Sequence, residues 1–244
     1  MQLTLIAILS IGGAAVAAQR PAQTRDIPLD LVCGPIASLS EPAQSIRVAG
    51  GVERVKTLFA AGDAVIVNAG SAQGLEPGQH FFVRRVIEDR FAVRTTEKPP
   101  RSIHTAGWLT IVETQENVSI AKITEACDGI SEGDYLEPFV VPPAAVAMKA
   151  GRPDFDHPGR IILADDRRQL GAGGGSLMVI DRGSDHGLRP GQRITLFRTT
   201  TGTNGSVVTI GEAFVATTQA ESALIRIEKS SEAIQVGDLV AIHR

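Results

Sequence analysis

The sequence predicts an all-β protein made of two tandem small modules, each a β-barrel or a β-sandwich, related by internal duplication. The segment GSAQGLEPGQ over 70–79 returns as GSDHGLRPGQ over 183–192. Short apolar runs and alternating segments are separated by turns rich in Gly, Pro and Asn. No segment has the sustained periodicity of a long helix. Because a repeated supersecondary unit is typical of tandem modules, we expect the two halves to share one fold.

The composition suits a globular protein and argues against some ligand classes. A chain of 244 residues with 43% hydrophobic content can form one large or two small domains. The net charge of −3 provides no overall positive field, so nucleic acid is not an expected partner. Only 4% of residues are aromatic, which leaves few rings for stacking on sugars or bases.

The N-terminus has the pattern of a secretory signal peptide over residues 1–18. An apolar run from Leu3 to Ile11 leads to small residues that end at Ala18. It lacks a basic n-region, and a buried first strand or a membrane anchor is the alternative. Because Gly12 and Gly13 interrupt the run, it is short for a bilayer span. We expect export to the periplasm or cell envelope and no transmembrane segment in the mature chain.

Residues 19–45 are predicted to form an extended leader, because they mix Pro, Gln, Ser and Ala without periodicity. Cys33 lies in this leader and Cys127 near the end of the first module. An even cysteine count in an oxidising compartment predicts a disulfide between them. The alternative is two independent buried thiols.

The first module is predicted over 46–139 and the second over 160–244, joined by a Pro-rich linker over 140–159. Each module should contain five short strands with small turns. In each module a buried apolar run comes first, over 64–67 and 177–180, and an alternating segment follows, over 81–85 and 194–198. A hairpin comes next, formed by 108–114 with 119–124 and by 213–218 with 222–228. The last strand follows a Gly-Asp pair, over 135–136 and 239–240.

The two copies align with a constant offset of 113 residues as far as Arg85, which pairs with Arg198. From Gly107 onward the offset is 104, so the first copy has nine extra residues before that point. Insertions are tolerated in surface loops, and this one is basic. We predict an interaction loop for anionic envelope polymers or an acidic partner, the alternative being a solvated mixed-charge loop. Its candidate residues are Arg84, Arg85, Arg90, Arg94, Lys98, Arg101 and His104.

The recurring carboxylates are typical of turns. Asp134 and Asp238 each follow a glycine at equivalent places, where a carboxylate accepts local backbone hydrogen bonds. Asp181 corresponds to Asn68, an exchange that a turn tolerates and that would disable a general acid or base.

Three further motifs also favour structural interpretations. Asp154, Asp156 and His157 are metal-binding residue types, but they lie in the Pro-rich segment. The tract GAGGGS over 171–176 lacks the lysine of a phosphate loop. The tract 47–51 resembles a protease N-terminus only faintly, and we interpret it as a Gly-rich turn. The sequence therefore predicts no catalytic, cofactor-binding or metal-binding residues, and no enzyme.

The second copy carries a strand, then Asp-x-Gly-Ser-x-x-Gly-Leu-x-Pro-Gly-Gln from Asp181, a strand ending at Arg198, Ile210-Gly211-Glu212, and Val236-Gly237-Asp238. This pattern resembles the C-terminal domain of flagellar assembly protein T. It is also similar to modules that accompany LysM domains in exported bacterial proteins, and the β domain of the rod-shape-determining protein C is comparable. The resemblance covers 170–243 well and 62–139 more loosely. It implies an envelope-located, non-catalytic scaffold module.

We therefore expect an exported, non-catalytic binding or assembly module whose partner is an envelope protein or a cell-wall polymer. One alternative is a wall-associated hydrolase with a pocket lined by His104 or His157. Another is a peptidoglycan-binding protein centred on Trp108 and Tyr135, although a tryptophan within a strand more often belongs to a core.

Overall fold

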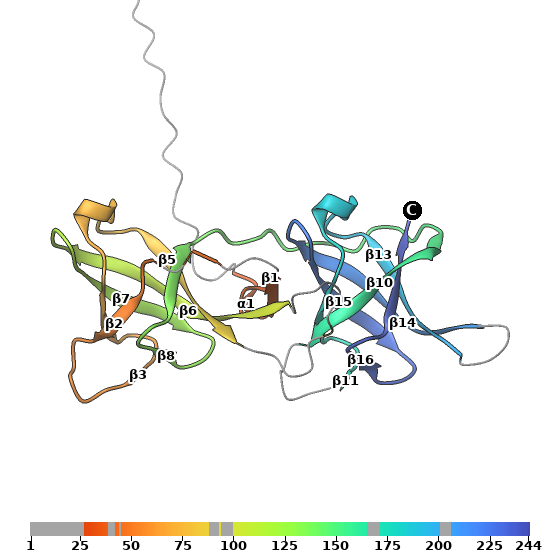
Figure 1. Ribbon diagram of the computed structural model, residues 1–244, viewed down its shortest axis with the longest axis horizontal. Coiled ribbons are helices and arrows are strands. Elements are labelled where there is room, and N and C mark those ends of the chain that lie inside the picture. The colour runs from red at the N-terminus through yellow and green to blue at the C-terminus, as the bar shows by residue number, and fades with distance from the viewer. Residues whose placement is uncertain are drawn as a thin grey trace, which may run out of the picture.

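The protein is all-β, as predicted, and forms two lobes side by side (Figure 1). The computed structural model describes residues 27–38, 42–43, 45–87, 93, 100–164, 171–200 and 206–244. The predicted signal peptide and three residues of the predicted interaction loop, Arg90, Arg94 and Lys98, lie outside this part. Among the described residues, helix is limited to α1 (Leu29–Val32) and the single turns η2 (Ser71–Gln73) and η3 (Ser184–His186). None of these helices has the length and apolar character needed to cross a membrane.

The first module is an antiparallel sheet in which the first and last strands meet. Its order is β2 (Val48–Gly51), β4 (Ala64–Val67), β7 (Ser119–Ala126), β6 (Arg101–Thr114), β5 (His80–Ile87) and β9 (Tyr135–Pro138). A bridge between Arg47 and Tyr135 brings β2 beside β9. A short pair, β3 (Leu58–Phe59) with β8 (Ile130–Ser131), lies outside this sheet.

The second module is a closed six-stranded barrel. Its order is β10 (Pro153–Ala164), β12 (Leu177–Ile180), β15 (Ala223–Ser230), β14 (Val207–Thr218), β13 (Arg193–Thr199) and β17 (Leu239–His243). The short pair β11 (Gly171–Ala172) with β16 (Ile234–Gln235) lies beside it. When the strands of each sheet are counted along the chain, the two modules place them in the same order across the sheet: β4, β7, β6 and β5 in the first module correspond to β12, β15, β14 and β13 in the second.

Each module has its own apolar interior, because alternate residues of every strand point inward. In the first module the interior includes Val65, Leu109 and Ile123, none of them more than 1% exposed. In the second it includes Met178 and Ile225, which are fully buried. Because these two clusters are separate, each module has a hydrophobic core of its own.

The repeated Gly-Ser-x-x-Gly segment forms the same turn in both modules. The Gly70 N–H donates to Gln73 Oε1 at 2.8 Å, and a Cβ on Gly70 would lie 2.0 Å from the carbonyl oxygen of Gln115. Gly74 adopts φ +81°, a left-handed conformation that favours glycine. The first glycine is therefore required by the close approach of the 115–118 turn, and the second by its own backbone angles.

Three predictions about connecting segments are changed by the structure. The tract 47–51, interpreted as a Gly-rich turn, is largely strand β2, in which an irregular register near Gly50 lets the strand bend. Strand β10 begins at Pro153, inside the segment predicted as a linker. The leader predicted over 19–45 contains helix α1 and strand β1 (Ile36–Ser38), which pairs antiparallel with β6.

Candidate functional site

The predicted disulfide is confirmed, and it attaches the leader to the first module. Cys33 and Cys127 are bonded with a Cα–Cα distance of 5.6 Å. Next to this bond, Val32 of helix α1 packs on Phe82 and Trp108. Trp108 is therefore buried under the leader, on the outer face of the first module.

The same leader also packs on the second module. Leu31 and Ala37 contact an apolar cluster on the outside of the barrel, which includes Leu177 and Leu224. The Ser222 hydroxyl donates to the Ala37 carbonyl oxygen at 3.0 Å, and Asp30 forms an ion pair with Arg226. We call residues 27–38 the wedge, because they lie between the two modules and contact both (Figure 1).

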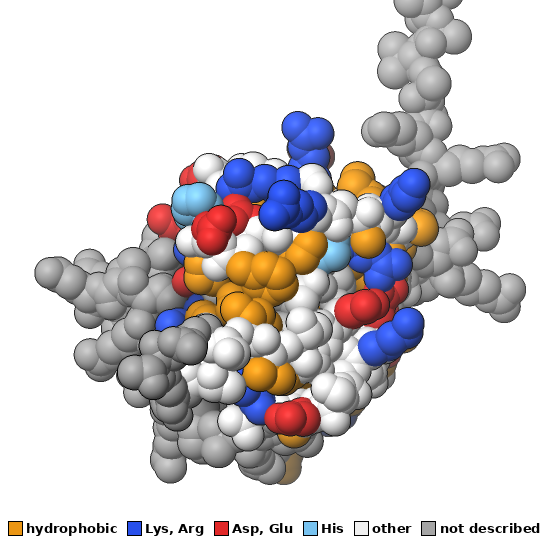
Figure 2. Space-filling view, turned by 90° about the vertical axis from the view of Figure 1, so that its right-hand side faces the viewer, with side chains coloured by type: hydrophobic (Ala, Val, Ile, Leu, Met, Phe, Trp, Pro, Cys, Tyr) orange, Lys and Arg blue, Asp and Glu red, His pale blue; other side chains and the backbone are white. Residues whose placement is uncertain are grey.

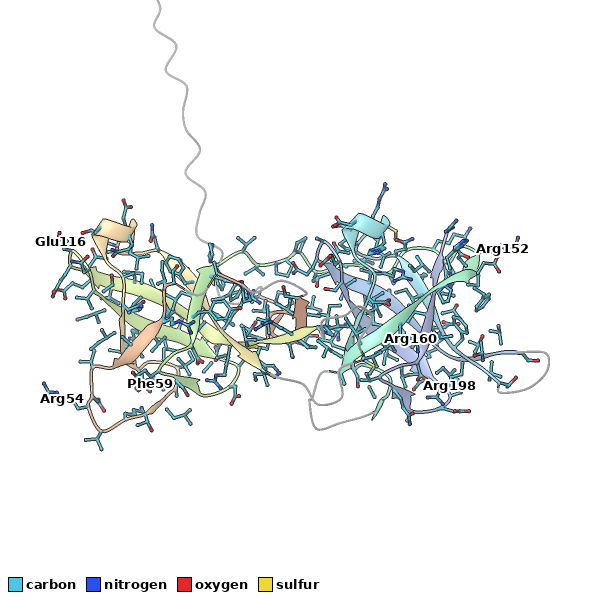
Figure 3. All side chains as sticks on the ribbon, viewed as in Figure 1. Arg54, Phe59, Glu116, Arg152, Arg160 and Arg198 are labelled. Carbon is cyan, nitrogen blue, oxygen red and sulfur yellow. A yellow bond between two sulfur atoms is a disulfide. The ribbon has the colours of Figure 1, made fainter. Side chains whose placement is uncertain are left out.

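The recurring arginine and aspartate residues form one clamp in each module. Arg85 donates from Nε and Nη2 to the Asp134 carboxylate at 2.6 and 2.7 Å. Arg198 makes the same two bonds to Asp238 at 2.6 and 2.8 Å, and it lies near the lower end of the second barrel (Figure 3). The hydrogen bonds to the aspartates raise the pKa of both arginines. These charges therefore stabilise the fold.

The turn interpretation of the carboxylates agrees with their hydrogen bonds. Asp134 Oδ2 accepts from the Ser131 N–H at 2.9 Å, and Asp238 Oδ2 from the Gln235 N–H at 2.7 Å. A second recurring bond joins the backbone N–H of Arg160 to Asp181, and that of Arg47 to Asn68, both at 2.7 Å. The exchange of Asp for Asn is tolerated because either side chain offers the same acceptor oxygen.

A cleft of about 530 Å³ lies where the wedge meets both modules. Its apolar lining comes from the wedge, from Pro42, from strands β6 and β10 and from the turn between β14 and β15: Ile36, Ala37, Pro42, Ile103, Ile162 and Ala220. Its charged and ionisable lining comes from both modules: Arg84, Glu137, Asp181, Arg182, His186 and Glu221. The cleft therefore exists only where the two modules are held together.

Arg84 belongs to a row of polar side chains, each with one buried atom that has no well-aligned hydrogen bond within the described chain. In the register of the sheet, Arg84 stands opposite Thr105 of β6 on one side and Tyr135 of β9 on the other. The Arg84 Nε, the Thr105 hydroxyl and the Tyr135 hydroxyl are buried without a hydrogen-bond partner among the described residues. Only one other buried side-chain atom of the described chain, His243 Nδ1, shares this property. We call Thr105, Arg84 and Tyr135 the polar row.

The second module has an apolar pair at the matching place. Phe197 stands opposite Thr209 of β14 and Leu239 of β17 in the same registers. The Phe197 ring packs against Phe155 with centroids 5.1 Å apart. Arginine at this place is therefore not a requirement of the strand order that both modules share.

Burial and charge set the electrostatics of the polar row. Arg84 Nε lies 2.9 Å from Glu137 Oε2, and its guanidinium carbon lies 4.8 Å from the centre of the Phe82 ring. Burial lowers the pKa of Arg84 and the Glu137 carboxylate opposes that shift, so the group stays charged at neutral pH. Burial, reinforced by Glu137, raises the pKa of Tyr135, whose hydroxyl therefore remains a hydrogen-bond donor.

The predicted interaction-loop residues are distributed over several environments. Arg84 lines the cleft and Arg85 belongs to the clamp. Arg101 is exposed and His104 half-buried, and both lie on strand β6, which pairs with β5 here. The region from 101 to 106, predicted as part of a loop, is therefore strand. Sequence reasoning did not single out Glu137, which lines the cleft, and it named Tyr135 only in the alternative of a peptidoglycan-binding site. Aligning the two copies sets Arg84 against Phe197, and this difference was a signal in the sequence.

The other candidate sites do not join the cleft. His157 Nδ1 lies 3.2 Å from Asp154 Oδ2, and Arg244 Nη2 lies 2.6 Å from the same oxygen. No group of three or more potential metal ligands occurs within the described ranges. Neither His104 nor His157 lines the cleft.

A second surface lies at the free end of the second module. Figure 2 shows hydrophobic side chains gathered on this face, with charged side chains around them. Exposed apolar residues of this module include Val207 and Val208, at 46% and 41%.

No known protein family matches the chain, and no curated protein sequence matches it significantly. The function is therefore inferred from the geometry of the junction.

Proposed function

We propose that the protein is an exported, non-catalytic binding or assembly component of the cell envelope. We further propose that its two modules arose by duplication of one β unit. The shared strand order and the two matching Arg–Asp clamps support the duplication. Envelope proteins and cell-wall polymers are the partner classes proposed.

Export is supported by the disulfide and by the pattern of the N-terminus. Disulfides persist mainly in oxidising compartments, and Cys33 and Cys127 form one. The resemblance of the second module to envelope scaffold domains, such as that of flagellar assembly protein T, agrees with this location.

The observation that carries the binding function is the wedge. It contacts both modules, is covalently attached to the first and hydrogen-bonded to the second. A cleft held open in this way is preorganised. Ligand binding therefore does not include the loss of conformational entropy that ordering the two modules would cost.

The test is to express the chain with its native N-terminus and to fractionate the cells. We expect loss of residues 1–18, measured by mass spectrometry, and recovery outside the cytoplasm. Cross-linking the mature chain to isolated envelope should then recover a partner, and less of it with the Cys33→Ser/Cys127→Ser variant. Retention in the cytoplasm, or cross-linking without any envelope partner, would contradict the proposal.

A further inference from the structure

We propose that the protein associates head to tail with further copies of itself, the second module of one copy docking on the first module of the next. The inference goes beyond the proposed envelope function and does not depend on it. It rests on the junction inside the chain, where a hairpin of one module meets the outer face of the other. The same hairpin and the same face occur once more in the molecule, and there both are uncovered.

The first module contributes a hairpin to the junction inside the chain. Strands β5 and β6 form this hairpin, and strand β1 of the wedge pairs with β6 at Ile103. In the connection between β5 and β6, the Val93 N–H donates to the Ile162 carbonyl oxygen of the second module at 3.2 Å. Val93 also packs against the apolar cluster of that module. Ile103 is covered by these contacts and is only 5% exposed.

The second module has the matching hairpin without a cover. Val86 stands opposite Ile103, and Thr199 opposite Val207, so Val207 is the counterpart of Ile103. Val207 is 46% exposed and its neighbour Val208 is 41% exposed. Among the described residues, strand β13 alone pairs with these two. Because successive residues of a strand point to opposite faces, both faces of this strand end expose an apolar side chain.

The second module contributes an apolar outer face to the junction. The junction buries six residues of this face: Ile162, Leu163, Leu177, Val179, Ala216 and Leu224. The offsets between the copies and the strand registers assign their counterparts on the first module: Ala49, Gly50, Ala64, Ile66, Val112 and Ile120. None of these counterparts is charged and none is buried. An uncharged outer face that is left open is typical of a docking surface.

The two uncovered surfaces lie at opposite ends of the molecule. Figure 1 shows both modules in the same orientation, with the pairs β3–β8 and β11–β16 on the lower side and both hairpins projecting to the right. The face of the second module that meets the first therefore has its counterpart on the far side of the first module. The β13–β14 hairpin lies at the other end (Figure 1). A further copy can therefore repeat the arrangement found inside the chain.

A head-to-tail contact covers both surfaces, and a symmetric dimer does not. Pairing two β13–β14 hairpins about a two-fold axis would leave Val112 and its neighbours exposed. Because each copy carries one surface of each kind, head-to-tail association continues beyond a dimer. The contact between copies lacks the disulfide and the wedge of the junction inside the chain, so we expect it to be weaker and reversible.

The experiment is sedimentation velocity on the full chain with its disulfide intact, over roughly a hundredfold range of concentration. We expect the average mass to rise with concentration and to exceed that of a dimer. Val207→Asp blocks the hairpin and Val112→Asp blocks the face, so each variant alone should stay monomeric. An equimolar mixture of the two retains one intact surface of each kind. It should reach about twice the mass of one chain and no more.

The matched control is Val146→Asp. Val146 is 85% exposed in the segment between the modules, outside both surfaces, so this variant should associate as the wild type does. Thermal melts of the three variants show whether the fold survives.

A second test introduces no charge. Val207→Cys and Val112→Cys chains are mixed and treated with a short bifunctional thiol reagent. We expect the cross-linked peptides, identified by mass spectrometry, to join position 207 of one copy to position 112 of another.

The outcomes separate this inference from its alternatives. A wild type that stays monomeric, or a mixture that stays monomeric while both variants keep their melting temperatures, would overturn it. Association lost in Val207→Asp but kept in Val112→Asp, or cross-links only between two copies of position 207, would show symmetric hairpin pairing instead. The envelope proposal fails on a different result: a wild type that assembles with itself and captures no envelope partner.

Discussion

Arg84 and Arg85 are neighbours in the sequence with unrelated roles, because successive residues of strand β5 point to opposite faces of the sheet. Arg84 faces the wedge side and lines the cleft. Arg85 faces the other way and is committed to Asp134. A run of basic residues therefore does not identify a binding surface until the face of each residue is known.

The clamp is expected to be a large local contribution to stability. Replacing Asp134 by alanine should lower the free energy of unfolding by about 3 kcal/mol, because the Arg85 guanidinium loses its carboxylate and the Ser131 N–H its acceptor. Urea denaturation measures this loss. Glu132→Gln, an exposed neighbour, is the control and should change stability by less than about 0.5 kcal/mol. Equal effects of the two variants would show that the clamp contributes little.

The wedge is a short element whose stability depends on contacts at both of its sides. Helix α1 has only four residues and no side-chain cap, so it would not persist alone in water. It is held by the disulfide, by the strand pairing of β1 with β6, and by burial of Val32 and Leu31 on different modules. Tertiary contacts thus decide its structure.

Trp108 is the single tryptophan of the chain and should report on the wedge. Replacing Val32 by aspartate places a carboxylate against Phe82 and Trp108, where burying an unpaired charge is unfavourable. We expect the wedge to lift, the tryptophan emission to move to longer wavelength, and the unfolding free energy to fall by more than about 2 kcal/mol.

Leu29→Asp provides the matched comparison, since Leu29 lies on the same helix and is 50% exposed. Its emission should remain that of the wild type. An unchanged spectrum for Val32→Asp would mean that the wedge does not cover the tryptophan in solution.

The whole molecule combines two similar modules with an unsymmetrical junction. Each module has its own core, and both use the same clamp and the same glycine turn. The differences concentrate on the outer faces: one buries Trp108 under the wedge, and the other carries an apolar cluster that the wedge covers. Function is therefore expected where the copies differ.

The relative position of the modules should depend on the apolar cluster around Leu224. Replacing Leu224 by aspartate puts a charge on the face that the wedge covers, while the barrel interior keeps its residues. We expect the modules to separate and the radius of gyration, measured by small-angle X-ray scattering, to increase. Lys229→Asp, at an exposed place on the same strand, should leave the scattering curve unchanged. A compact Leu224→Asp variant would show that other contacts hold the junction.

Much of the fold could be predicted from local pattern. The strands around Val65 and Val179, both hairpins, the scarcity of helix and the disulfide follow from alternation, turn residues and cysteine count, which act over a few residues. Strand β2 was missed because its two glycines look like a turn, and only pairing with β4 makes the segment extended. The signal peptide stays a prediction.

The amino-acid order alone specified two β modules, their turns and the partner of Cys33, because each depends on neighbouring residues or on the only available thiol. Three-dimensional packing decided the rest. The leader became a wedge because apolar faces on both modules cover it. Arg84 lines a cleft with Ile36 and Glu137, and Arg85 forms a clamp with Asp134. These partners lie more than forty residues away in the sequence and meet only in the folded chain. Such contacts are set by burial across the whole molecule, which local sequence does not encode.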